Sequence, residues 1–115
     1  MNVDLPNLFE LASHRLKWLS DKQKAVSENI ANADTGGFKA REVESFDSYL
    51  RAAEGQTVSP DAVVTLDETT WGQDLTGNNV ILEEQILASS ETAGQYRVAA
   101  NLYRKAHEMV RTVVS

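Results

Sequence analysis

Cysteine is absent from this chain of 115 residues. The absence excludes disulfide bridges and thiolate chemistry, and it leaves the redox compartment open. Aromatic residues are also scarce, at 7% of the chain, and all apolar residues together make up 42%. A chain of this size and composition can bury only a small core. Much of its stability must therefore come from packing between long elements or from partners.

Long hydrophobic runs are missing as well. No window approaches the roughly 20 apolar residues of a membrane-spanning helix. The residues Asp4, Glu10 and His14 interrupt the apolar residues near the start, which excludes the apolar region of a cleavable signal peptide. If the protein leaves the cytoplasm, we expect it to be exported by a route that needs no such signal.

Positive charge is clustered nowhere. Residues 1–41 carry six basic and five acidic residues, residues 42–91 carry one and eleven, and residues 92–115 carry four and one. These counts correspond to net charges of +1, −10 and +3, which add up to −6. Binding to nucleic acid or to an anionic membrane surface needs clustered lysine and arginine. We therefore predict neither kind of partner.

A long amphipathic helix is predicted over residues 5–33. Its apolar positions alternate at spacings of four and three, the heptad pattern of a helix that packs along another helix. They are Leu5, Phe9, Ala12, Leu16, Leu19, Val26, Ile30 and Ala33, with Gln23 as a polar member. A polar residue within such a stripe often fixes the register of packing. Trp18 lies beside the stripe, and we interpret it as an exposed contact to another subunit.

A second amphipathic helix is predicted over residues 79–115. One stripe consists of Leu82, Ile86, Ser89, Ala93, Tyr96, Ala100, Tyr103, His107, Val110 and Val114, and an adjacent one of Ala99, Leu102, Ala106, Met109 and Val113. Together they span a wider arc than one partner helix covers. We therefore predict that part of this surface is an interface between subunits. Asn78 or Asn79 is expected to cap the start of the helix.

The segment between the helices, residues 38–76, lacks helical periodicity and is acidic. We predict an irregular loop that becomes ordered on assembly. Helical turns at residues 46–53 and a short strand at residues 62–66 are the alternatives. The predicted fold class is all-α: a single domain, residues 1–115, with two long terminal helices in an antiparallel coiled-coil-like hairpin.

No catalytic, metal or cofactor site is predicted. His14 and His107 have no Cys, His or acidic companion at ligand spacing, so each is interpreted as a core or interface residue. Ser13 beside His14 has no acidic orienting group in any motif. No Lys-Ser or Lys-Thr pair follows Gly36 and Gly37 as in a phosphate-binding loop, so they are predicted to form a turn. We do not expect the chain to be an enzyme.

Two short motifs carry most of the functional information. The first, Asn-Ile-Ala-Asn-Ala-Asp-Thr-Gly-Gly-Phe-Lys, ends the first predicted helix, and the second, Gly-Asn-Asn-Val, precedes the second helix. Both resemble segments of the flagella basal body rod protein family. The matching positions are Asn29, Ile30, Ala31, Asn32, Asp34, Thr35, Gly37 and Phe38, and Gly77, Asn78, Asn79 and Val80. Gly36 and Ile81 depart from that pattern, which usually has proline and aspartate there.

The resemblance implies a structural subunit of the proximal rod of the bacterial flagellum, which takes part in motility as a piece of the drive shaft. It implies export of the unfolded chain through the flagellar type III apparatus into the rod that spans the periplasm. The implied partners are copies of the chain, neighbouring rod proteins and the base at the inner-membrane ring. A cytoplasmic coiled-coil adaptor or a flagellar export chaperone is the alternative.

Two groups of residues are predicted to matter for assembly. Asn29 and Asn32 stand one turn apart where the first helix ends, and we interpret them as hydrogen-bonding either the turn or an adjacent subunit, with simple helix capping as the alternative. The residues predicted to pack subunits together are Leu16, Trp18, Leu19, Val26, Ile30, Tyr96, Leu102, Tyr103, Met109, Val110 and Val113.

Overall fold

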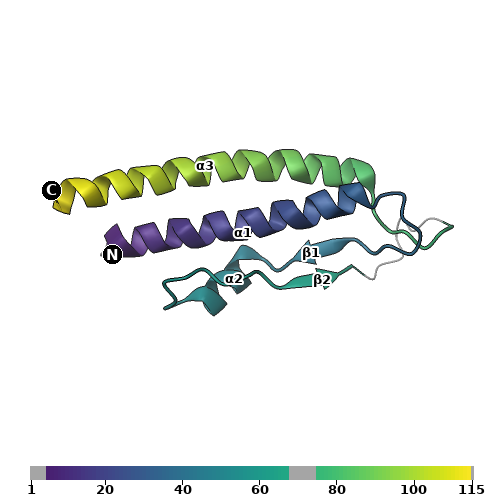
Figure 1. Ribbon diagram of the computed structural model, residues 1–115, viewed down its shortest axis with the longest axis horizontal. Coiled ribbons are helices and arrows are strands. Elements are labelled where there is room, and N and C mark those ends of the chain that lie inside the picture. The colour runs from purple at the N-terminus through teal and green to yellow at the C-terminus, as the bar shows by residue number, and fades with distance from the viewer. Residues whose placement is uncertain (1–4, 68–74, 115) are drawn as a thin grey trace.

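The computed structural model describes residues 5–67 and 75–114, and two long helices dominate it. The elements are α1 (Leu5–Ala31), β1 (Arg41–Val43), α2 (Phe46–Ala53), β2 (Val64–Leu66) and α3 (Leu82–Val114). The helices α1 and α3 lie side by side and antiparallel, so that α1 begins and α3 ends at the same end of a molecule 61 Å long (Figure 1). The predicted antiparallel pair of terminal helices is thereby confirmed.

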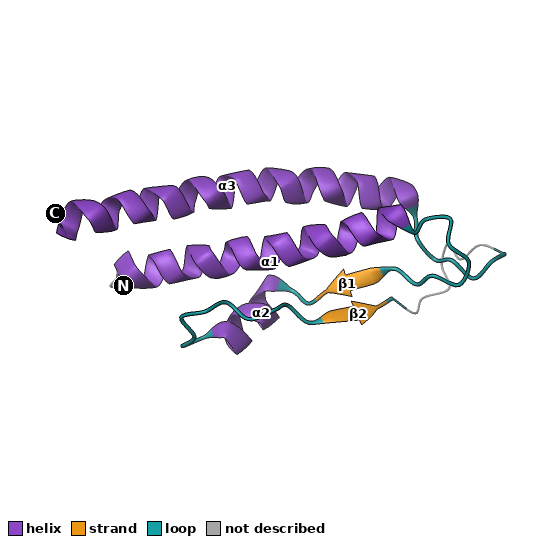
Figure 2. Cartoon of the chain, in the orientation of Figure 1, coloured by secondary structure: helices purple, strands orange, loops and turns teal. Residues whose placement is uncertain are grey.

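The central segment is more regular than the sequence suggested. Residues 40–66, which we call the central hairpin, contain β1, α2 and β2 (Figure 2). The strands pair antiparallel with Glu42 opposite Thr65, and further backbone hydrogen bonds extend the ladder from Asp67 to Ala40 and from Glu44 to Val63. The prediction of an irregular loop over this part was wrong. Its two alternatives, helical turns at 46–53 and a strand near 62–66, describe it correctly.

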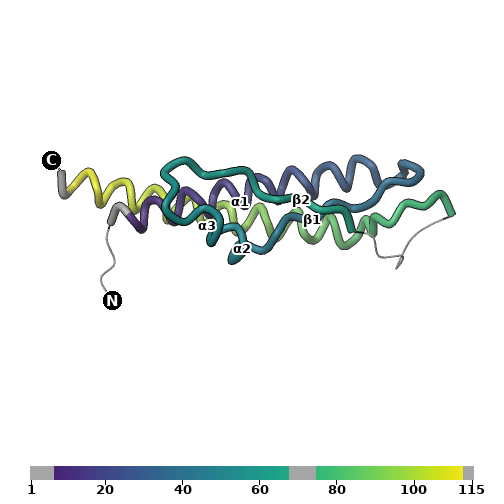
Figure 3. Tube along the Cα trace, turned by 90° about the horizontal axis from the view of Figure 1, so that it is seen from below, coloured from purple at the N-terminus to yellow at the C-terminus, as the bar shows by residue number. Residues whose placement is uncertain are grey.

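The helix α1 is the middle layer of the molecule. The helix α3 lies along one side of it and the central hairpin along the other (Figures 1 and 3). The heptad stripe of α1 explains only its contact with α3, not its contact with the central hairpin. The second contact uses α1 residues that lie off the stripe, and Trp18 is the most important of them.

A small aromatic core joins α1, α2 and α3. It contains Trp18, Leu19, Tyr49, Ala53 and Ala99. Trp18 is only 7% exposed, and its indole Nε1 donates to the carbonyl oxygen of Glu44 at 2.7 Å. The interpretation of Trp18 as an exposed contact was therefore wrong. Its large apolar ring and its single donor are both satisfied within this chain.

Small side chains form the contact between α3 and α1. Thr92, Ala99 and Ala106 are buried at seven-residue spacing. They are flanked by Ser89, whose Oγ accepts a hydrogen bond from Gln23 Nε2 at 2.9 Å, and by Tyr103, whose ring lies 4.6 Å from that of Phe9. The buried line runs along the border of the two predicted stripes of α3. Each stripe therefore keeps most of its large apolar side chains on the outside.

Candidate functional site: a sealed helix junction and an exposed apolar groove

The junction between α1, β1 and α3 is built on the side chain of Asn29, which is 1% exposed. Its Nδ2 donates to the carbonyl oxygen of Arg41 at 3.0 Å and to Oε1 of Gln85 at 3.0 Å. Its Oδ1 accepts from the backbone N–H of Arg41 at 2.8 Å. One buried amide thus uses both of its donors and its acceptor to hold three elements together.

Two further buried asparagines close the end of α1. Asn78 Nδ2 donates to the carbonyl oxygens of Asn32 and Thr35, at 2.8 and 2.7 Å, in the turn that follows α1. Asn79 Oδ1 accepts from the backbone N–H of Ala40 at 2.6 Å. The expectation that one of them caps α3 was wrong. Both lie before Leu82, where α3 begins, and bind the preceding turn and strand instead.

The turn between α1 and β1 and the segment before α3 each have a glycine where the backbone requires it. Gly37 and Gly77 have φ angles of 75° and 85°, in the left-handed region that side chains disfavour. Gly37 N–H donates to the carbonyl oxygen of Thr76 at 2.7 Å, and Asn79 N–H donates to that of Phe38 at 3.2 Å. The two motifs, far apart in sequence, therefore form one backbone-to-backbone contact.

The remaining residues of the motifs have local roles. Asn32 Nδ2 donates to the carbonyl oxygen of Glu28 one turn earlier, and its Oδ1 accepts from Thr35 Oγ1 at 3.1 Å. The bond to Glu28 matches helix capping, the alternative weighed for Asn32, and the bond to Thr35 matches the preferred interpretation of a hydrogen bond to the turn. Asn29, in contrast, bonds a strand and another helix. Ile30 and Val80 are half-buried, while Ala31 and Asp34 are exposed.

The central hairpin is tied to α1 by buried polar contacts. His14, which is 3% exposed, lies with Nδ1 2.7 Å from Ser59 Oγ, and its Nε2 lies 3.6 Å from a carboxylate oxygen of Glu10. Burial raises the pKa of Tyr49, whose hydroxyl donates to the carbonyl oxygen of Pro60 at 2.8 Å. His14 is thus a core residue, as the sequence predicted. Its Nδ1 makes the contact with the hairpin, whereas Nε2, which makes no hydrogen bond within the described residues, lies near Glu10 of the same helix.

A second tie between hairpin and α1 is ionic. Lys17 Nζ lies 2.7 Å from Asp21 and 3.0 Å from Asp61. The hydrogen bond to Asp21 raises the pKa of Lys17, and the hydrogen bond from Lys17 lowers the pKa of Asp61. Asp21 also accepts from the backbone N–H of Ala62 at 2.9 Å. These contacts hold the segment that leads into β2 against α1.

Within residues 5–67 and 75–114, no three His, Asp or Glu side chains gather as metal ligands would. Across the same residues, no helix is long and apolar enough to cross a membrane.

The residues predicted to pack subunits together fall into two groups. Trp18, Leu19 and Val26 are buried in this chain, and Leu16, Ile30, Tyr103 and Val110 are half-buried. Tyr96, Leu102 and Met109 are exposed, at 43%, 59% and 47%. The side chain of Val113 lies outside the part that the structure describes. The buried group serves the fold of this chain, so only the exposed group remains available to a neighbour.

Further exposed apolar residues belong to the same helices. They are Leu11 on α1 and Leu82, Ile86, Leu87 and Val98 on α3. Leu82 and Ile86 are members of the first predicted stripe, but they were not among the residues predicted to pack subunits together. Leu87 and Val98 lie off both stripes, so spacing alone gave no signal for them.

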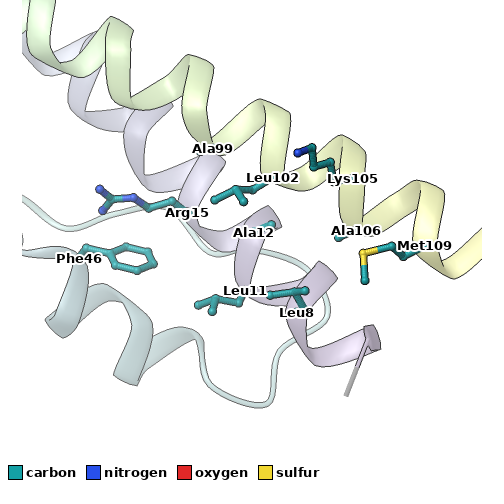
Figure 4. Close-up of a pocket in the computed structure, with 10 residues that line it drawn as sticks. All are labelled: Leu8, Leu11, Ala12, Arg15, Phe46, Ala99, Leu102, Lys105, Ala106 and Met109. Atoms are coloured by element: carbon teal, nitrogen blue, oxygen red, sulfur yellow. The ribbon is translucent and has the colours of Figure 1, made fainter. Parts of the chain in front are cut away.

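A groove with apolar walls runs between α1 and α3 beside α2, with a volume of about 360 Å³ (Figure 4). We call it the apolar groove, and its walls are Leu8, Leu11, Ala12, Arg15, Phe46, Ala99, Leu102, Lys105, Ala106 and Met109. The guanidinium of Arg15 stacks over the rings of Trp18 and Phe46, at 4.8 and 4.7 Å from their centres. Burial lowers the pKa of Arg15, but an arginine stays charged. Two cations, Arg15 and Lys105, thus border an apolar floor.

An elongated helical pair in which α3 buries small residues and leaves most of its large apolar residues exposed defines a class of protein: a structural subunit made for assembly. Comparison with known proteins gives the particular family. Residues 9–39 match the family model described as "Flagella basal body rod protein". The chain is also 32% identical to the flagellar basal body rod protein FlgB of Agrobacterium fabrum, over 93% of this chain and 92% of that protein.

The chain therefore belongs to the flagella basal body rod protein family, and it is a structural rod subunit of the flagellar basal body. The family match covers α1 from Phe9 onward and the first motif, which includes the turn that Asn78 closes.

Proposed function

We propose that the chain is a subunit of the proximal part of the rod, where it polymerises through its two terminal helices as part of the drive shaft for motility. One observation carries the proposal: α3 buries Thr92, Ala99 and Ala106 against α1 and leaves most of its large apolar side chains exposed. A monomer gains nothing from that arrangement, because the hydrophobic effect rewards burial of the large side chains. In an assembled subunit, neighbouring copies can cover these large side chains, and the hydrophobic effect then stabilises the assembly.

The similarity to FlgB supports a position at the base of the rod. The partners proposed on this basis are copies of the chain, adjacent rod proteins, the base at the inner-membrane ring and the flagellar type III export apparatus. Export without a cleavable signal peptide and a place in the rod across the periplasm complete the proposal. No catalytic step is part of it, because a rod subunit acts by transmitting torque through packed interfaces.

The test is complementation of a strain that lacks the gene, with fractionation of detergent-resistant basal bodies. Leu102→Ser combined with Met109→Ser removes two exposed apolar side chains from α3. We expect the variant to reach normal cellular levels but to be lost from basal bodies, with loss of swimming. The matched control is Val63→Ser with Leu66→Ser on the central hairpin, where the side chains are also exposed.

The control should be incorporated like the unchanged chain. An unchanged chain found only in the soluble cytoplasm would overturn the proposal in favour of the adaptor or export chaperone. Normal incorporation of the Leu102→Ser, Met109→Ser variant would contradict the role given to α3.

A further inference from the structure

We propose that the apolar groove of one subunit receives the first turns of α3 from a neighbouring copy of this chain. The proposal rests on the proposed rod function and specifies one of its contacts. We call the contributing residues Leu82, Glu83 and Ile86 the α3 ridge. Leu82 and Ile86 are 40% and 55% exposed and lie one helical turn apart.

The groove and the ridge lie on different sides of α3. At 3.6 residues per turn, Ile86 and Leu102 are separated by roughly 160° around the helix axis. The contact with α1, along Thr92 and Ala99, lies on the wider of the two arcs that separate them. A side-by-side neighbour can therefore cover the groove with its ridge while its own groove stays open for the next copy.

Such a contact uses two different patches, and it continues from copy to copy without closing into a dimer. With Ile86 seated between Leu102 and Met109, neighbouring copies with parallel α3 helices are displaced by about 30 Å along that axis. A stepwise displacement of this kind is what a helical tube requires.

The charges of the two patches are complementary. Arg15 and Lys105 border the groove, and Glu83 lies within the ridge. More broadly, the segment from residue 42 to residue 91 carries a net charge of −10, and residues 92–115 carry +3. Two grooves facing each other would bring like charges together, whereas a groove facing a ridge pairs opposite ones.

Oxidative cross-linking tests the contact directly, because the chain has no cysteine of its own. We would express Ile86→Cys with Leu102→Cys, and separately Ile86→Cys with Met109→Cys, in the deletion strain and oxidise purified basal bodies. At least one pair should give cross-linked dimers and higher multimers. The control pair, Ile86→Cys with Leu66→Cys, uses an exposed position on β2 and should stay uncrosslinked.

Charge reversal gives an independent readout. Glu83→Lys and Lys105→Glu should each lower incorporation into basal bodies by about fivefold or more, and the double reversal should restore it to within about twofold of the unchanged chain. Neither residue belongs to the buried core, so both variants should keep normal helicity.

The outcomes separate the two proposals. If the unchanged chain is absent from basal bodies, the proposed function fails. If it is present but neither cysteine pair cross-links, or if the double reversal does not restore incorporation, the groove contact is overturned. A cross-linked dimer of the single variant Leu102→Cys would also overturn the proposed contact, since it would show that the grooves of two copies face each other.

Discussion

Single asparagines decide how the chain turns back on itself. Asn29, Asn78 and Asn79 are each 4% exposed or less, and each bonds backbone groups of another segment. A buried amide is stable only when its donors and acceptors are satisfied. These side chains therefore supply hydrogen bonds that the irregular backbone around the turn cannot make with itself.

The pair Asn29→Ala and Asn32→Ala separates a tertiary role from a local one. Asn29→Ala leaves the N–H and carbonyl of Arg41 and the amide of Gln85 without this partner, so we expect a loss of about 2 kcal/mol in the free energy of unfolding. Asn32→Ala removes contacts within its own turn and should cost less than about 1 kcal/mol. Urea unfolding followed by circular dichroism measures both. Equal losses would contradict the assignment of Asn29 to the junction.

At the scale of elements, the central hairpin is attached to α1 mainly by polar groups. Lys17, Trp18 and Asp21 of α1 hold Asp61, Glu44 and Ala62 of the hairpin. Of the hairpin's own strands, β2 is exposed along its whole length. Its position therefore depends on charges and hydrogen bonds as well as on the aromatic core.

Acid should loosen this attachment. Because Lys17 lowers the pKa of Asp61 below 3.8, this carboxylate contributes stability above that value and loses the contribution as the pH falls through its lowered pKa. The melting temperature of Asp61→Asn should therefore fall less than that of the unchanged chain between about pH 6 and about pH 3. The control Asp47→Asn breaks a pair with Arg51 that lies within α2. Because this pair does not join the hairpin to α1, the variant should follow the unchanged chain. Parallel curves for all three proteins would contradict this account.

For the whole molecule, one helix pair has to serve both folding and assembly. Trp18 and Leu19 face the inner core, while Leu102 and Met109 face the apolar groove. The molecule is 61 Å long but only 24 and 22 Å across. So thin a shape offers little interior, and much apolar surface is left for neighbours.

Folding and assembly should respond to different substitutions. Trp18→Ala removes a buried ring and should lower the free energy of unfolding by about 3–5 kcal/mol, enough to unfold a marginal monomer. Leu102→Ala removes an exposed side chain and should change that free energy by less than about 0.5 kcal/mol. Thermal unfolding of the purified chains provides the measurement. A large loss of stability in Leu102→Ala would place Leu102 in the core and contradict the division.

The heptad spacing of the terminal segments determined the two long helices and their pairing, because the apolar stripes are buried only if another helix lies alongside. Their antiparallel direction followed from the central segment, through which the chain folds back. The two motifs identified the family and located the turn. The sequence could not determine which part of the two adjacent α3 stripes packs against α1, since both stripes are apolar. The tertiary structure decided this by burying the small residues at their border.

The roles of Trp18, Asn78 and Asn79 were also decided only by the tertiary structure. Their partners lie 26, 43 and 12 residues away in the sequence, at Glu44, Thr35 and Asp67. Local spacing predicts which side chains share a helix face, but it carries no information on which distant backbone group will meet a buried donor. The folding of the hairpin onto α1 buries Trp18 in the core, and the return of the chain to the end of α1 buries Asn78 and Asn79 against their backbone partners.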